Sequence, residues 1–196
     1  MICEESPLIL ASASPRRREI LTWAGVPFEV YPAPDEYAPA GLVPFDRVRE
    51  LAKSKAAQVA PRFPGRTVLG SDTMVVCDDR VLGKPHTPDE AVDMLMLLQG
   101  REHTVMTGVW CIRTDETGHT VREDGFTDTV AVKFYPFPRE EAAAYVATGE
   151  PMDKAGAYGI QGRGMRLVER INGDFFSVMG LPGGRLLRFL ASFENS

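Results

Sequence analysis

Two serines and two arginines lie together where the chain should turn from a buried strand into a helix. These residues are Ser12, Ser14, Arg16 and Arg17. The apolar run Leu8–Ala11 predicts the strand, and Pro15 directly after Ser14 is typical of the first position of a helix. A helix N-terminus presents free backbone N–H groups and the positive end of the helix dipole, so it favours anions. The pattern indicates a phosphate site, although three consecutive arginines would also suit a solvated helix face.

One aspartate stands in the middle of an otherwise apolar segment. Residues Thr67–Cys77 predict a strand, because apolar and β-branched residues flank a Gly-Ser-Asp-Thr centre that contains Asp72. A carboxylate inside a buried strand costs free energy unless it is paired, bound to a metal or functional. Asp72 is therefore the carboxylate that we most expect to take part in chemistry.

Two further charged residues lie upstream of this strand. The spacing of apolar residues predicts a helix from about Phe45 to Val59, and Lys55 lies on its apolar stripe. Either its stem is buried while the ammonium reaches solvent, or the ammonium is held at the wall of a cleft. Glu36 lies in the proline-rich segment Pro32–Pro44, which we expect to be a surface loop where a carboxylate is either solvated or functional.

The rest of the pattern mixes strands and helices without strict alternation. Further strands are expected at 28–31, 81–82, 105–114, 121–134 and 165–171, and further helices at 15–24, 88–99, 138–148 and 182–193. Five glycines between residues 156 and 173 indicate tight turns or the close approach of a ligand. We therefore expect an α/β fold around a mixed, curved sheet, in two lobes whose cleft would hold the site.

Composition excludes several classes of protein. With 44% hydrophobic and 25% charged residues over 196 positions, the chain can bury a core and is not expected to be disordered. A net charge of −5 disfavours binding to nucleic acid, but it allows a small anion to bind where cations gather. We expect no membrane span and no signal peptide. The three cysteines form neither a metal nor a disulfide pattern, so a cytoplasmic protein is expected.

Several short motifs, in order along almost the whole chain, resemble those of the Maf family of nucleoside triphosphate pyrophosphatases. They are Ala11-Ser12-Ala13-Ser14-Pro15-Arg16-Arg17, Gly70-Ser71-Asp72-Thr73, Gly83-Lys84-Pro85, Thr107-Gly108-Val109 and the run from Asp153 to Gly162. Glu36, Lys55-Ala56, Gly173-Asp174 and the run from Val178 to Pro182 fit as well. Each motif alone is weak, and together they are specific.

The resemblance implies one Maf-like domain over residues 1–196, with an elongated mixed β-sheet flanked by helices and a deep central cleft between two lobes. It also implies hydrolysis of a nucleoside triphosphate to the monophosphate and pyrophosphate with a divalent cation, Mg²⁺ or Mn²⁺. Members are regarded as house-cleaning enzymes of nucleotide pools and are linked in bacteria to arrest of cell division. The run from Ala157 to Gly162 is similar to the branch that acts on dTTP and UTP, which are therefore the expected substrates.

The resemblance also assigns roles to individual residues. Asp72 matches the proton acceptor. The positions tied to base specificity are Arg16, Thr73 and Gln161. The positions that bind the phosphates and other parts of the substrate are Ser14, Arg17, Lys55 and Lys84. Glu36 and Asp72 would hold the metal, directly or through water.

Two alternatives to this function remain at this point. One is the same reaction on 7-methyl-GTP or on a modified nucleotide. The other is a nucleotide-binding regulator of division with little turnover. The sequence also leaves open whether the apolar helix at 182–193 lines a homodimer interface or only closes the core.

Overall fold

Seven strands form one mixed sheet in a computed structural model that describes residues 2–194. The strands are β1 (Leu8–Leu10), β2 (Phe28–Val30), β3 (Thr67–Cys77), β4 (Arg80–Leu82), β5 (Glu102–Thr114), β6 (Thr120–Phe134) and β7 (Val168–Asn172). Their order is β2-β1-β3-β5-β6-β7, and β4 pairs with β3. β1 runs parallel to β2 and β3, whereas β4 and β7 are antiparallel to β3 and β6. The predicted mixed sheet is therefore confirmed.

Helices flank this sheet, which confirms the predicted α/β class. The α-helices of the described residues are α1 (Pro15–Trp23), α2 (Pro44–Val59), α3 (Pro88–Leu98), α4 (Arg139–Val146), α5 (Phe175–Met179) and α6 (Gly183–Glu194). Short 3₁₀ helices are η1 (Ala60–Arg62), η2 (Glu150–Asp153), η3 (Ala155–Ala157) and η4 (Gly162–Leu167). In residues 2–194 no helix is both long enough and apolar enough to cross a membrane.

By its internal contacts the chain divides into two compact units. The first unit comprises residues 2–72, 107–128 and 180–194, and the second comprises 73–106 and 129–179. The boundary on β3 falls between Asp72 and Thr73, two residues to which the sequence assigned different roles.

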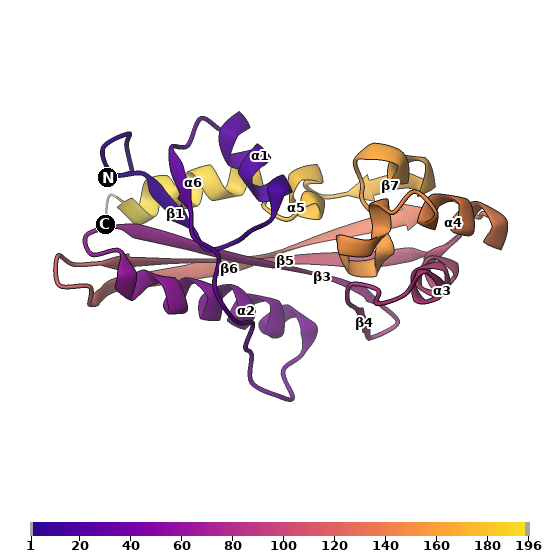
Figure 1. Cartoon of the computed structure of the whole chain (residues 1–196), viewed down its shortest axis with the longest axis horizontal. Helices are drawn as coiled ribbons and strands as arrows, with labels where there is room; N and C mark the ends of the chain where they lie inside the picture. Colours follow the sequence, from indigo (N-terminus) through magenta and orange to yellow (C-terminus); the bar gives the residue numbers. More distant parts are fainter. Residues whose placement is uncertain (1, 195–196) are drawn as a thin grey trace. The chain divides into compact units, whose positions relative to one another are not determined.

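In the first unit, α2 covers one face of the sheet while α1 and α6 lie on the other (Figure 1). The predicted apolar stripe of α2 is buried, and so is Lys55. Glycines let this helix approach the strands closely: a Cβ on Gly70 would stand 2.0 Å from the carbonyl oxygen of Ala52, and one on Gly108 would stand 2.3 Å from that of Val48. Residues of α2 one turn beyond Ala52 are therefore held directly over the centre of β3.

The second unit has a core of its own beneath α3 and α4. Leu95, Leu98, Val132 and Phe134 are completely buried there. The helix α3 begins as its sequence predicts, because Thr87 Oγ1 accepts a hydrogen bond from the Glu90 N–H group at 3.1 Å.

The second unit differs from the sequence prediction at two places. The predicted strand over residues 165–171 begins only at Val168, because Met165–Leu167 continue the 3₁₀ helix η4. The short helix α5 was not predicted. Asp174 organises its first turn, since Asp174 Oδ1 accepts a hydrogen bond from the Phe176 N–H group at 2.8 Å.

Candidate functional site

The side chain of Arg17 joins three segments of the first unit. Its Nη1 donates to Ser12 Oγ at 2.8 Å, and its Nε donates to the carbonyl oxygen of Gly180 at 2.9 Å. The same carbonyl oxygen accepts a hydrogen bond from Ser71 Oγ at 3.0 Å. Arg17 is only 8% exposed. It therefore fixes the turn between β1 and α1 to β3 and to the residues that precede α6.

The start of α1 matches the sequence prediction in position but not in its capping contact. Ser14 occupies the N-cap position and Pro15 lies in the first turn, yet the Ser14 side chain makes no capping hydrogen bond. Its backbone N–H group instead donates to Ser12 Oγ at 3.3 Å. Ser12 thus organises the turn, and the Ser14 hydroxyl has no partner within residues 2–194.

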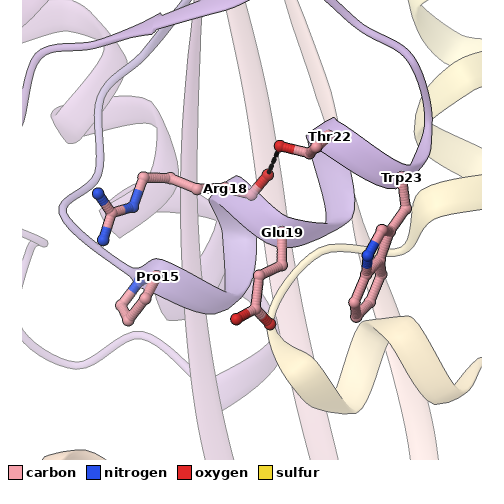
Figure 2. A pocket seen from close by; sticks show the side chains of 5 residues that line it. All are labelled: Pro15, Arg18, Glu19, Thr22 and Trp23. Atoms are coloured by element: carbon pink, nitrogen blue, oxygen red, sulfur yellow. Dashed lines mark hydrogen bonds between the residues drawn. The ribbon is translucent and has the colours of Figure 1, made fainter.

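The three consecutive arginines lie in three different environments. Arg16 is half-buried, Arg17 is buried and Arg18 is exposed. Figure 2 shows Arg18 on the outer side of α1, where it lines a hollow together with Pro15, Glu19, Thr22 and Trp23. The interpretation as a solvated helix face therefore holds for Arg18 but not for Arg17.

Lys55 brings two of the predicted carboxylates together. Its Nζ lies 2.6 Å from Asp72 Oδ1 and 2.8 Å from Glu36 Oε1. Lys55 and Asp72 are buried, being 7% and 9% exposed, whereas the side chain of Glu36 is 63% exposed. The charge of Asp72 is thus paired inside the fold. Its other oxygen, Oδ2, has no partner within the described residues.

The guanidinium of Arg17 interacts electrostatically with the carboxylates of Asp72 and Glu36. Burial lowers the pKa of Arg17 from its ordinary value, and the charge of Arg16 acts in the same direction. The carboxylates of Asp72 and Glu36 oppose this effect. Because a guanidinium keeps its proton in proteins, the first unit holds an electrostatically coupled group of cations and carboxylates.

The carboxylate oxygens of Glu36 and Asp72 suit a divalent cation that binds together with an anionic ligand. Within residues 2–194, no three histidine, cysteine, aspartate or glutamate side chains gather as a metal site of their own. Mg²⁺ is commonly held by one or two carboxylates and completes its shell with water and substrate phosphates. Glu36 and Asp72, drawn together by one lysine, fit that arrangement.

Three other predicted residues belong to the second unit. Thr73 follows Asp72 on β3 and is half-buried. Lys84 is exposed, and Gln161 is half-buried; neither side chain has a partner among the residues that the structure describes. The Gly156 N–H group donates to the carbonyl oxygen of Gly83 at 3.0 Å. This bond places the Gly-Lys-Pro motif of Lys84 beside the glycine-rich run that contains Gln161.

An aromatic cluster anchors that glycine-rich run. The Tyr158 hydroxyl lies 2.8 Å from His103 Nε2, and both rings pack edge-on against Phe134. Burial lowers the pKa of His103 to about 4 and raises the pKa of Tyr158. His103 is therefore neutral at physiological pH.

Sequence reasoning gave no role to four residues that have clear structural roles at these sites, although two of them lie within the quoted motifs. They are Ser71, Tyr145, Glu150 and Gly180. Ser71 and Gly180 meet across a long stretch of chain, and Tyr145 contacts the backbone of Gly159. Only Ser71 carried a local signal, because a hydroxyl beside Asp72 in a buried strand also requires a partner.

Comparison with known proteins gives the family. The family model described as Maf-like protein matches residues 7–193. A dTTP/UTP pyrophosphatase of Symbiobacterium thermophilum is 49% identical over 187 residues, which are 95% of this chain and 93% of that protein. A relative of the same name from Moorella thermoacetica is 50% identical over 190 residues, 96% of this chain and 95% of that protein.

A third relative and one solved structure were also compared with the chain. The dTTP/UTP pyrophosphatase of Bacillus velezensis is 45% identical over 188 residues, 95% of this chain and 96% of that protein. The structure of the Staphylococcus aureus Ham1 protein shows a distant likeness, with a TM-score of 0.43, 14% identity, and coverage of 66% of this chain and 72% of that one. Because the family match spans almost the whole sequence, the chain belongs to the Maf family.

Proposed function

We propose that this protein hydrolyses dTTP and UTP to the monophosphate and pyrophosphate, and so removes these nucleotides from the cellular pool. The observation that carries the proposal is the ion pair between Lys55 and Asp72, shared with Glu36, at the centre of β3. It holds a carboxylate ready to act on water beside the cations of α1. The relatives named dTTP/UTP pyrophosphatase support the choice of substrate.

In the proposed reaction, a water oxygen bonds to the α-phosphorus while the bond to the bridging oxygen breaks and pyrophosphate leaves. Asp72 would orient the water and accept its proton at Oδ2, while Lys55 holds Oδ1. Phosphoryl transfer depends mainly on positioning and on cations. Lys84 would contact the phosphates. Arg17 would contribute its charge and hold the turn that carries Ser14.

Glu36 and Asp72 would hold Mg²⁺ or Mn²⁺ together with phosphate oxygens. When bound, the cation would neutralise phosphate charge and lower the pKa of water. The contribution of the protein is to keep both carboxylates at one place, through Lys55, before the ion and the nucleotide arrive.

By the resemblance, the base would be recognised by Thr73, Gln161 and Arg16. A thymine or uracil edge presents an N–H donor between carbonyl acceptors. The Gln161 amide offers both a donor and an acceptor, and no described residue occupies either. A site that bonds such an edge discriminates strongly against bases that lack it.

The proposal is tested by measuring pyrophosphate release from dTTP, UTP, CTP, GTP and 7-methyl-GTP with Mg²⁺ or Mn²⁺. We expect release from dTTP and UTP. The Asp72→Asn variant should lose turnover by about 10²–10⁴-fold, because it removes the proton acceptor. Thermal unfolding of the variant should show that it remains folded, since an asparagine oxygen can still accept from Lys55.

Each other outcome would change a defined part of the proposal. Release from 7-methyl-GTP alone would keep the reaction and overturn the substrate. Normal turnover in Asp72→Asn would remove that residue from its role as proton acceptor. Binding of nucleotide without any pyrophosphate would identify a nucleotide-binding regulator instead of an enzyme.

A further inference from the structure

Two side chains of the second unit hold the backbone on both sides of Gln161. The Tyr145 hydroxyl accepts a hydrogen bond from the Gly159 N–H group at 3.1 Å and donates to Glu150 Oε1 at 2.9 Å. The Glu150 carboxylate also accepts from the N–H groups of Arg163, at 2.9 Å, and Gly164, at 3.1 Å. We call Tyr145 and Glu150 the clamp.

Two glycines of the segment held by the clamp leave no room for a side chain. A Cβ on Gly162 would stand 2.8 Å from Glu150 Oε2, and one on Gly164 would stand 2.6 Å from the Tyr145 hydroxyl. Gly162 also has a φ of +66°, which side chains rarely adopt. A Cβ on Gly164 would also stand 2.2 Å from the carbonyl oxygen of Gly159, so the clamp and the backbone that it holds together exclude side chains at these two positions.

The clamp works with Glu150 as a carboxylate. Burial alone would raise the pKa of Glu150, but hydrogen bonds from Arg163, Tyr145 and Gly164 outweigh it and lower the pKa below its ordinary value. Each partner of the carboxylate is a donor. A neutral amide at this position would set its own N–H₂ group against one of those donors.

We propose that the clamp is a positioning device for base selectivity, which fixes residues 159–164 so that the Gln161 amide meets a pyrimidine without first being ordered. This inference rests on the proposed function. Binding groups that are fixed in advance lose less conformational entropy when the ligand binds. The clamp should therefore improve binding only of nucleotides whose base contacts Gln161. Tyr145 and Glu150 act through Gln161 and need not touch the nucleotide.

The test compares Tyr145→Phe with Tyr135→Phe. Both variants lose one hydroxyl, but Tyr135 is exposed and its hydroxyl has no partner within residues 2–194. Substrates are dTTP and dATP, which share the triphosphate and sugar and differ only in the base. In Tyr145→Phe we expect kcat/KM for dTTP to fall about tenfold, mainly through KM, because both hydrogen bonds of the Tyr145 hydroxyl are lost. The value for dATP should stay close to that of the wild type.

Hydrogen exchange of the backbone provides a second readout that does not depend on activity. Exchange at residues 159–164 should become faster in Tyr145→Phe and in Glu150→Gln, and stay unchanged in Tyr135→Phe. Unchanged exchange, or an equal loss of activity on dTTP and dATP, would overturn the role of the clamp. A wild type without preference for dTTP would overturn the proposed substrate together with the selectivity role.

Discussion

Lys55 is a buried cation that two carboxylates share, and its removal should destabilise the fold. Lys55→Met would leave the Asp72 carboxylate, 9% exposed, without its partner. Loss of one partner from a buried ion pair typically costs about 3 kcal/mol of unfolding free energy. Adding Asp72→Asn should restore part of the loss, with a coupling of about 1–3 kcal/mol. Urea unfolding of the two single variants and the double variant measures these values.

Lys84 gives the matched control because it is exposed and has no partner in residues 2–194. Lys84→Met should change the unfolding free energy by less than about 0.5 kcal/mol. It should instead raise KM for dTTP about tenfold, through loss of a charged contact to phosphate. Equal stability of Lys55→Met and Lys84→Met would contradict the buried pair, and an unchanged KM in Lys84→Met would remove Lys84 from substrate binding.

At the scale of elements, the position of α2 over β3 decides where Lys55 lies. Gly70→Ala would place a methyl group 2.0 Å from the carbonyl oxygen of Ala52 and 2.8 Å from the backbone nitrogen of Ala56. The helix would have to move outward, at a cost of roughly 2–3 kcal/mol. Turnover should fall as well, because Lys55 moves with α2. Urea unfolding and pyrophosphate release measure both effects.

Gly184→Ala is the control for this substitution. Gly184 lies in α6, and a Cβ there would meet no atom within 4 Å. The change should be neutral or stabilise the protein by up to about 1 kcal/mol, because alanine favours helix. If Gly70→Ala were as stable as this control, α2 would not rest on the sheet at Gly70.

The sequence predicted elements well where a local rule decides them. Pro15 and Pro88 marked the first turns of their helices, and the apolar stripe of α2 identified its buried face. It failed at Met165–Leu167, where apolar residues alternate but distant contacts of Glu150 hold the preceding backbone in a 3₁₀ turn. Contacts between residues far apart in sequence leave no periodic pattern, so the clamp was not predicted either.

At the scale of the whole molecule, the candidate residues divide between two units. The first holds Arg17, Lys55 and Asp72, and the second holds Thr73 and Gln161. Residue type and motif were enough to name these candidates, because a buried carboxylate or lysine is rarely incidental. The contacts between these residues could not be predicted in the same way. Lys55 joins Asp72 to Glu36 only because of how α2 packs on the sheet. The deep cleft between lobes stays a prediction.

Stability of the whole protein should depend on pH through His103, a buried residue outside the proposed chemistry. Burial lowers its pKa from 6.5 to about 4, so the folded state keeps it neutral. Below pH 6.5 His103 is protonated in the unfolded chain but stays neutral in the folded chain. The free energy of unfolding therefore decreases until the pH reaches about 4. The full loss corresponds to roughly 3 kcal/mol. Urea unfolding measured from about pH 7 down to about pH 5 should show the decline.

Between about pH 7 and pH 5 the effect of His103 on stability can be distinguished from that of the carboxylates, because the carboxylates take up protons mainly at lower pH. Glu150 and Glu194 have lowered pKa values, so their stabilising contribution is present above the ordinary value of 4.5 and is lost as the pH falls further. His103→Gln keeps a polar group opposite the Tyr158 hydroxyl but cannot titrate, and it should flatten the curve between about pH 7 and pH 5. A wild-type curve that is already flat would mean that the folded protein protonates His103 without cost.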